Sequence, residues 1–363
     1  MSGLVINGRF MAARPTGVQR VAYELVRQLG RHREELGDLF GAPPRILAPR
    51  GVDYAVNPSS LLLDCDSWLR GHAWEQIELP LRARGAVLLS LCNLSPVLAV
   101  RAGVECVTMF HDAQVFTSPA SYSAAFGAAY RWAQPRIGAQ ARRILTVSHF
   151  SAGQLAQFGM APAERIRVIH NGIDHAGKMM ADRAILSRLG LEHGGYVLAL
   201  ASAQAHKNID VLLRAFADGG CGGVKLVLFG AGGAEDFPAA GPDVVFVGRV
   251  SDGELAALMG DALCFAMPST TEGFGLPPLE AMAQGCPAVI APCGALPEVC
   301  GDAALQAAPD DPAAWRGAFA LLHEDAALRA RLVQRGLAQA GQFTWVRAGD
   351  ALMAVLREVA AER

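Results

Sequence analysis

Short apolar runs rich in β-branched residues recur along the first half of the chain. They cover residues 4–7, 45–49, 86–91, 104–112, 142–148 and 165–174. Apolar positions at helical spacing follow the first run, over residues 17–32, and the fifth run, over residues 151–159. This alternation predicts a parallel sheet with helices on both of its faces.

The same alternation starts again after a polar stretch at residues 175–195. Apolar runs cover residues 196–202, 224–230, 243–249, 262–269, 286–292 and 303–309, helical patterns cover 208–218 and 251–261, and the chain beyond about 310 is mostly helical. At 363 residues the chain exceeds one comfortable hydrophobic core. We therefore expect two doubly wound α/β domains. Ligands of such sheets bind at the carboxyl ends of the strands, so we expect a site where the two domains face each other across a cleft.

Composition narrows the function. Hydrophobic residues make up 52% of the chain and charged residues 18%, which argues against long disorder. The net charge of −2 argues against a nucleic-acid-binding protein. The eight cysteines show no zinc-site spacing, and neither a signal-peptide pattern nor a membrane-spanning run is apparent. We expect a protein of the reducing cytoplasm.

The stretch STTEGFGLPPLEAMAQG, residues 269–285, follows one of the predicted strands. Its glycines allow a close approach of a ligand to the backbone, and its two prolines stand where a helix can begin. Amides just before a helix N-terminus suit a phosphate group. Glu272 is expected at the strand end and Glu280 in the first helical turn. The same pattern also fits a Pro/Gly loop with one solvated and one capping glutamate.

A resemblance becomes specific at this stretch. Continued to EGFGLPPLEAMAQGCPAVIAPCGALPEVCGDAA, it resembles the signature of family 4 of the retaining glycosyltransferases, which have the GT-B fold. QAHKNIDVLLRAF, VTMFHDAQVF, ILTVSHFSAGQL and VIHNGID resemble other segments of that family, in the expected order. WEQIELPLRARGAVLLSLCNLSP and TGVQRVAYELV resemble a subgroup that builds bacterial surface polysaccharides, often with mannose. The similarity covers nearly the whole chain.

The resemblance implies roles for individual residues. Glu280 would bind the ribose of a nucleotide-sugar donor, and Glu272 would contact the transferred sugar. Lys207 would stabilise the leaving diphosphate, and His111 would lie near the reacting sugar. Gly17 would belong to the glycine loop after the first strand. Main-chain amides would hold sugar hydroxyls and phosphates: Gly273, Phe274, Gly275 and Leu276.

Each role has a plainer alternative. Lys207 could be an exposed surface lysine, but the chain has only three lysines, which favours the functional interpretation. His111 could be a buried strand-end histidine bonded to the backbone. Many relatives carry an arginine where His206 stands, so an imidazole replaces part of the positive charge facing the diphosphate. Arg249 is a candidate to compensate for it or to stack near the base.

Asp64-Cys65-Asp66 matches the metal-binding DxD pattern of another glycosyltransferase fold. It has no acidic or histidine partner nearby in sequence, so we interpret it as a surface loop and predict transfer without a metal ion.

The implied architecture is α/β, with two Rossmann-like domains of the GT-B type. We expect an acceptor-side domain over residues 1–178, a nucleotide-sugar domain over 179–345, and a C-terminal helix over 346–363 that packs back on the first domain. The implied reaction is retaining transfer of a sugar, first of all mannose from GDP-mannose, without a further cofactor. The acceptor would be a glycan or a polyprenyl-diphosphate-linked oligosaccharide.

Two rival functions remain open. The first is an epimerase or a phosphorylase of the same fold. An epimerase would need no acceptor, and a phosphorylase would hold pyridoxal phosphate on a lysine. A non-catalytic sugar-binding or nucleotide-binding module would usually carry a signal peptide. Residues 130–143, YRWAQPRIGAQARR, fit a peripheral membrane segment, although a helix broken at Pro135 and packed on the sheet is the preferred interpretation.

Overall fold

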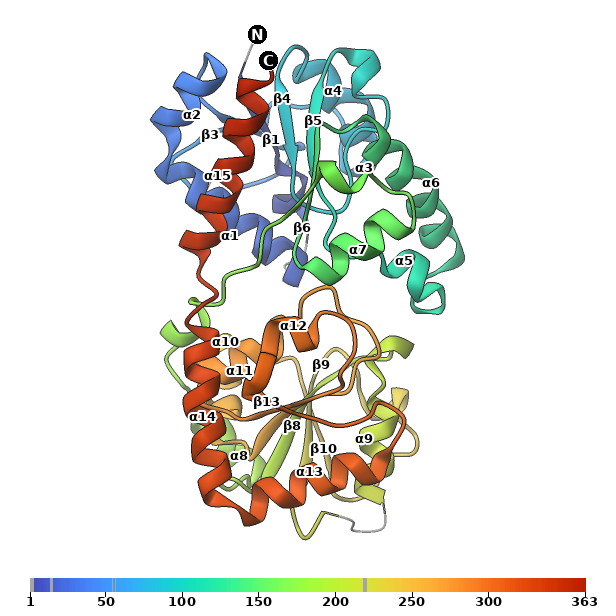
Figure 1. Cartoon of the computed structure of the whole chain (residues 1–363), viewed down its shortest axis with the longest axis vertical. Coiled ribbons are helices and arrows are strands. Elements are labelled where there is room, and N and C mark those ends of the chain that lie inside the picture. The colour runs from blue at the N-terminus through green and yellow to red at the C-terminus, as the bar shows by residue number, and fades with distance from the viewer. Residues whose placement is uncertain (1–2, 14–15, 54, 56, 218–220) are drawn as a thin grey trace. The chain divides into compact units, whose positions relative to one another are not determined.

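The computed structural model describes residues 3–13, 16–53, 55, 57–217 and 221–363, and they form two compact units (Figure 1). Unit 1 contains the chain up to Pro119, Ser123–Asn171 and Trp345–Arg363. Unit 2 contains Ala120–Tyr122 and Gly172–Thr344. No helix among the described residues is long and apolar enough to cross a membrane.

Unit 1 is built on a seven-stranded parallel sheet in the order β3-β2-β1-β4-β5-β6-β7. Its strands are β1 (Leu4–Asn7), β2 (Arg45–Leu47), β3 (Leu62–Asp64), β4 (Val87–Ser90), β5 (Glu105–Met109), β6 (Arg143–Thr146) and β7 (Ile166–Val168). Its helices are α1 (Gly17–Arg31), α2 (Arg33–Phe40), α3 (Gly71–Ala73), α4 (Leu79–Arg82), α5 (Gln114–Thr117), α6 (Ala124–Gln140), α7 (His149–Gln157) and α15 (Trp345–Ala361).

Unit 2 is built on a six-stranded parallel sheet in the order β10-β9-β8-β11-β12-β13. Its strands are β8 (Tyr196–Ala201), β9 (Lys225–Gly230), β10 (Val244–Gly248), β11 (Cys264–Met267), β12 (Ala288–Ile290) and β13 (Ala304–Gln306). Its helices are α8 (Ala184–Leu189), α9 (Ile209–Phe216), α10 (Asp252–Asp261), α11 (Leu276–Ala283), α12 (Leu296–Cys300), α13 (Pro312–Glu324) and α14 (Ala326–Ala340).

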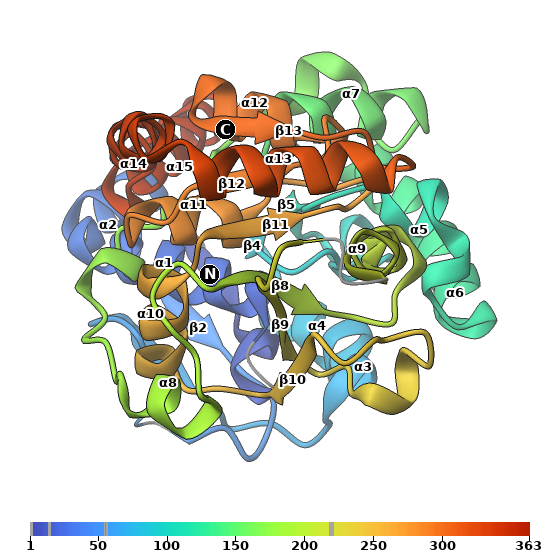
Figure 2. The same ribbon diagram turned by 90° about the horizontal axis from the view of Figure 1, so that it is seen from below.

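Both faces of the unit 2 sheet are covered, as Figure 2 shows with α9 on one side and α10 and α11 on the other. The alternate residues Val197 and Ala199 of β8 pack in one core cluster with Trp315 and Phe319 of α13. Leu198, which points to the opposite face, is also fully buried. Burial on both faces explains why these strands read as continuous apolar runs, and the predicted α/β class is confirmed.

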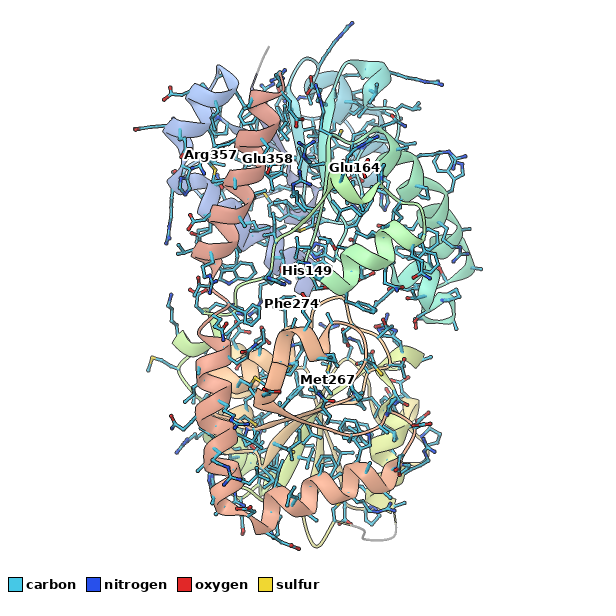
Figure 3. The ribbon with its side chains drawn as sticks, viewed as in Figure 1. His149, Glu164, Met267, Phe274, Arg357 and Glu358 are labelled. Atoms are coloured by element: carbon cyan, nitrogen blue, oxygen red, sulfur yellow. The ribbon has the colours of Figure 1, made fainter. Side chains whose placement is uncertain are left out.

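The C-terminal helix α15 belongs to unit 1, where it packs along α1 and is held by ion pairs (Figure 3). Glu358 lies 3.4 Å from Arg143 and 3.1 Å from Arg167, and Arg357 lies 2.7 Å from Glu35. Arg143, the first residue of β6, and Arg167, the middle residue of β7, therefore anchor a helix that is far away in sequence. Such exposed pairs each add little stability, but together they fix the position of the helix.

Two expectations about local structure were wrong. The segment containing Asp64 was interpreted as a loop, but Leu62–Asp64 form the edge strand β3, a short run in which only Leu63 is buried. The helix expected to break at Pro135 continues to Gln140. A proline removes one main-chain donor, but α6 is held on both sides of Pro135 because Ala133 and Ile137 pack in one core cluster of unit 1.

Gly138 provides a test of packing in unit 1. A Cβ atom there would lie 1.6 Å from the Met160 carbonyl oxygen, so α6 can pack this closely only with glycine. We expect Gly138→Ala to lower the free energy of unfolding by about 2 kcal/mol or more, measured by urea denaturation. The control is Gly153→Ala in α7, where a Cβ meets no atom within 4 Å and alanine should stabilise by about 0.5–1 kcal/mol. Equal effects would contradict the packing argument.

Candidate functional site

The winding of the unit 2 sheet reverses between its two central strands. The chain proceeds from β8 to β9 and β10 on one side, and from β11 to β12 and β13 on the other. The carboxyl ends of β8 and β11 are therefore neighbours at a switch point, where ligands of such sheets bind. Lys207 follows β8 and Glu272 follows β11.

Lys207 and Glu272 form an ion pair at this switch point. The Lys207 Nζ donates to Glu272 Oε1 at 2.7 Å, and both side chains are largely buried, with 16% and 9% of their surface exposed. The surface-lysine interpretation of Lys207 is therefore wrong. Burying two charges costs desolvation energy, so a buried ion pair need not stabilise the fold. Such pairs are common at functional sites, which makes this position a candidate site.

The two loops that carry this pair are tied together by hydrogen bonds. The His206 carbonyl accepts from the Thr270 amide at 2.8 Å. Asn208 has a left-handed backbone, with φ of 54°, and its Nδ2 donates to the carbonyls of Pro268, at 3.0 Å, and Pro309, at 2.7 Å. These bonds fix the position of Lys207, and sequence reasoning missed the part of Asn208 in it.

His206 is buried, and its Nδ1 lies 2.8 Å from the Ser121 hydroxyl, which also belongs to unit 2. Burial lowers the pKa of His206, the charge of Lys207 lowers it further, and Glu272 opposes both. The imidazole is thus favoured in its neutral form beside Lys207. It does not simply replace the positive charge of an arginine. Arg249 follows β10 directly and is exposed.

The loop after β11 has the predicted form. Phe274 is buried with its ring 5.7 Å from that of Phe343, and Figure 3 shows it just before α11. Gly275 has φ of 98° at the N-cap of α11, and Leu276 is the first helical residue, so the three amides from Phe274 to Leu276 do precede a helix N-terminus. Gly294 permits a second loop to lie on this one, since a Cβ there would be 2.4 Å from the Glu272 nitrogen.

Glu280 lies one turn later in the helix than expected. Because α11 begins at Leu276, Glu280 is its fifth residue, and no acidic residue occupies the first turn. Its Oε1 is 3.1 Å from Nε2 of His175, with both side chains about 15% exposed. His175 was not among the predicted site residues, because it lies more than a hundred residues earlier in the chain.

His111 belongs to unit 1, two residues after β5. Its Nε2 lies 2.9 Å from the Leu91 carbonyl oxygen, and its amide donates to Asn93 Oδ1 at 2.7 Å. A carbonyl can only accept, so Nε2 carries the proton and Nδ1 presents a lone pair. Burial lowers the pKa of His111 to about 4 and the Leu91 bond offsets only part of this, so the imidazole is neutral at pH 7. These contacts match the alternative interpretation of His111 as a buried histidine bonded to the backbone. Its Nδ1 remains a hydrogen-bond acceptor.

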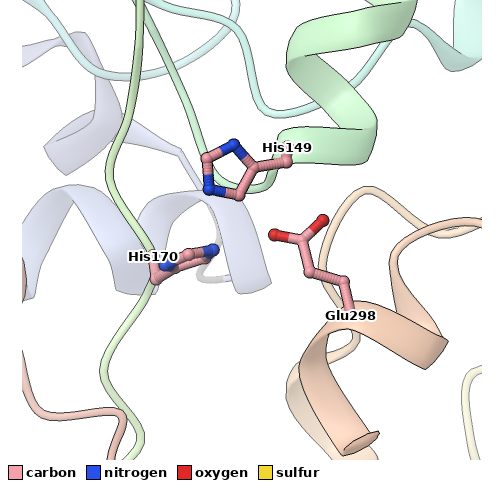
Figure 4. Close-up of side chains that lie close together, drawn as sticks. All are labelled: His149, His170 and Glu298. Atoms are coloured by element: carbon pink, nitrogen blue, oxygen red, sulfur yellow. The ribbon is translucent and has the colours of Figure 1, made fainter.

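The remaining residues lie elsewhere in unit 1. Gly17 is the exposed first residue of α1. Asp64 accepts from Arg82 at 2.7 Å, so the DxD carboxylate is already paired. Figure 4 shows two histidines that sequence reasoning missed, His149 at the start of α7 and His170 after β7, with ring centroids 5.6 Å apart. Glu298, drawn with them, comes from α12 of unit 2.

The buried histidines make stability depend on pH. The pKa of His111 is about 4 in the folded state and about 6.5 when unfolded, so below pH 6.5 the unfolded chain binds a proton that the native state does not. This contribution should lower the free energy of unfolding by about 2 kcal/mol between pH 7 and pH 5. Urea denaturation at both pH values measures it. In His111→Gln the free energy of unfolding should fall by about 2 kcal/mol less between the two pH values than in the parent protein. The control His323→Gln, at an exposed site, should show the same fall as the parent protein. Equal falls in both variants would contradict the assignment of this pH dependence to His111.

Comparison with known proteins gives a consistent result. Residues 15–176 match the model described as Glycosyltransferase Family 4, and residues 194–325 match that described as Glycosyl transferases group 1. The O-antigen chain mannosyltransferase B of Escherichia coli is 33% identical over 262 residues, 66% of each chain. A D-inositol 3-phosphate glycosyltransferase of Nocardioides is 34% identical over 245 residues, 58% of this chain and 52% of its own length. The matched region thus spans about half to two-thirds of these relatives.

Solved structures with the same fold cover almost the whole chain. Anabaena HepE, crystallised with UDP and glucose, has a TM-score of 0.76 at 18% identity over 99% of this chain and all of its own. WaaG, a glycosyltransferase involved in lipopolysaccharide biosynthesis, has a TM-score of 0.69 at 14% identity over 96% of this chain and 99% of its own. With two doubly wound parallel sheets and both family models matched, the chain belongs to glycosyltransferase family 4, a family of retaining hexosyltransferases, and has the GT-B fold.

Proposed function

We propose that this chain transfers a hexose, with retention of configuration, from a nucleotide-sugar donor to a glycan acceptor in surface-polysaccharide synthesis. The observation that carries the proposal is the Lys207–Glu272 pair at the unit 2 switch point, next to the amides that precede α11. The lysine cation of this pair and the amides of Gly275 and Leu276 support a site for a diphosphate leaving group, because both kinds of group stabilise phosphate oxygens.

We assign the remaining residues the roles that the family implies. Glu272 exchanges its bond with Lys207 for hydroxyls of the transferred sugar once the donor binds, which frees Lys207 for the diphosphate. Glu280 binds the ribose and is oriented by His175. His111 is neutral, so through Nδ1 it accepts a hydrogen bond from a sugar hydroxyl and donates no proton from that atom. His206 and Arg249 complete the donor side, and Gly17 adds to it from the glycine loop after the first strand, where the phosphates of the donor and the acceptor approach the backbone.

The protein supplies positioning and electrostatics to this reaction. The nucleotide diphosphate leaves from the face that the acceptor hydroxyl attacks, and its oxygens take up the acceptor proton. No covalent intermediate with the protein is required. The substrate-binding groups hold the acceptor hydroxyl beside the leaving diphosphate, on the same face of the transferred sugar, as a front-side substitution requires.

GDP-mannose is the proposed donor, on the strength of the O-antigen mannosyltransferase relative, and the acceptor is a glycan or a polyprenyl-diphosphate-linked oligosaccharide. HepE was crystallised with UDP and glucose, which keeps UDP-glucose as the second candidate. Peripheral membrane contact at the cytoplasmic face would involve α6, where Trp132 is 54% exposed and the Arg136 guanidinium lies 4.6 Å from its ring centre.

Lys207 should matter for turnover, and its effect is separable from a general loss of positive charge. Lys207→Ala removes the charge that stabilises the leaving diphosphate, so kcat should fall by about 10²–10³-fold in a radiolabelled or coupled GDP-release assay. The control is Lys225→Ala, because Lys225 begins β9 and therefore lies at the amino edge of the same sheet. An unchanged kcat in Lys207→Ala, or an equal loss in the control, would contradict the assignment.

A thermal-shift panel of GDP, UDP, dTDP and ADP identifies the donor class. GDP should raise the melting temperature most, and the shift should persist in EDTA because we propose metal-independent binding. GDP-mannose should then be turned over in EDTA, and activity restored only by manganese would contradict this.

An epimerase would convert the donor without any acceptor, and a pyridoxal-phosphate absorbance would favour a phosphorylase. A non-catalytic module would be favoured if the protein binds a nucleotide tightly but releases no nucleotide from any nucleotide sugar.

A further inference from the structure

Two asparagines of this chain have a strained backbone. Among the described residues other than glycine, only Asn93 and Asn208 have a positive φ, of 57° and 54°. Such a conformation costs energy for a residue with a Cβ atom, and it persists where the surrounding structure requires it. Asn208 directly follows Lys207, and the amide of His111 donates to the Asn93 side chain. Each strained position thus adjoins a candidate reactive residue, and none of the roles assigned above uses Asn93.

Asn93 lies in the segment after β4, beside the end of β5. Its amide donates to the Met109 carbonyl at 3.0 Å, and its Oδ1 accepts from the His111 amide at 2.7 Å. Its carbonyl accepts from Gln134 Nε2 of α6 at 3.4 Å. Asn93 therefore connects the chain after β4 to the end of β5 and to α6, all within unit 1.

The same segment also holds the imidazole of His111. Leu91, two residues before Asn93, presents its carbonyl to His111 Nε2 at 2.9 Å. The His111 carbonyl accepts from the Ser151 hydroxyl of α7 at 3.1 Å. His111 is thus held at its amide, its carbonyl and its ring, and Leu91 and Asn93 supply two of these three bonds.

The residue type at position 93 indicates what this strained backbone is for. Glycine occupies the other positive-φ positions of the described chain, because it adopts them without strain. Asparagine tolerates a left-handed backbone better than most residues with a Cβ atom, and it adds a side-chain acceptor. The bond that glycine could not make at this position is the one from Asn93 Oδ1 to the His111 amide.

We infer that Asn93 is a positioning residue for His111, an inference that rests on the proposed transferase function. The Oδ1 bond fixes the main chain of His111, so that the ring stays at the Leu91 carbonyl with the proton on Nε2 and Nδ1 as the acceptor. Without this bond the ring can turn or take the other tautomer. A misplaced ring should slow the reaction more than it weakens donor binding, because the proposed diphosphate and ribose contacts belong to unit 2.

Turnover of GDP-mannose tests this role. Asn93→Gly allows the same backbone conformation but removes the Oδ1 bond, so kcat for GDP release should fall by about tenfold or more while the donor KM stays near that of the parent protein. Asn93→Asp keeps an acceptor oxygen and tolerates positive φ, so it should retain most of the activity. The matched control is Asn57→Gly, which removes a side-chain bond to the Leu61 carbonyl, at 2.9 Å, and should leave kcat unchanged.

Histidine NMR gives a second readout that does not depend on turnover. In protein labelled with ¹⁵N-histidine, long-range ¹H–¹⁵N spectra distinguish the two neutral tautomers, and His111→Gln identifies the signals of His111. The parent protein and Asn93→Asp should show only the Nε2–H tautomer at pH 7, whereas Asn93→Gly should show both. A thermal melt shows whether Asn93→Gly folds. If it does not, Asn93→Ser replaces it, because the serine side chain is one bond too short to reach the His111 amide.

The inference is overturned if Asn93→Gly keeps the kcat of the parent protein or a single His111 tautomer. It is also overturned if Asn93→Asp is as impaired as Asn93→Gly, or if Asn57→Gly loses as much activity. If the parent protein releases no GDP from GDP-mannose, the proposed donor chemistry fails, and the NMR comparison alone decides whether Asn93 positions His111.

Discussion

The reversal of winding between β8 and β11 is the constraint on which the candidate site depends. Where the winding reverses, two neighbouring parallel strands have adjacent carboxyl ends, but the loops that follow them lead in opposite directions along the sheet. Lys207 and Glu272 stand on those two loops, 65 positions apart in sequence, and meet at 2.7 Å. Two largely buried opposite charges need each other in the absence of a ligand, because either one alone would be costly to desolvate. In the proposed mechanism, the bound donor replaces Glu272 as the partner of Lys207.

The same constraint operates in unit 1 with a different result. Asn7 and Ser90 end the two strands that flank its switch point, and Asn7 donates to both the Ser90 hydroxyl and Glu75. In unit 2 the Lys–Glu hydrogen bond is well formed, whereas in unit 1 the Arg9–Glu75 pair is close but poorly aligned. A well-formed charge pair suits a charged ligand that displaces it.

Much of the fold and the position of several candidate site residues along its strands could be predicted from the chain alone. Strands buried on both faces read as unbroken apolar runs, and the loop after β11 carries glycines and prolines whose conformations are restricted enough to be recognised. The edge strand β3 was missed because only Leu63 of its three residues is buried. The helix that continues through Pro135 was missed because Ala133 and Ile137, on both sides of the proline, pack in a core cluster, which periodicity cannot reveal.

The sequence by itself determined which chemical groups follow which strands: a lysine after β8, two glutamates around a glycine-rich loop after β11, and a histidine after β5. Order along the chain is enough for this, because each group is attached to a locally recognisable element. Only the tertiary structure decided their partners. It joined Lys207 to Glu272 and His175 to Glu280, gave His111 its Leu91 carbonyl, and brought Glu75 to Asn7 at the end of β1. These contacts depend on strand order and burial, which are long-range properties that no local pattern encodes.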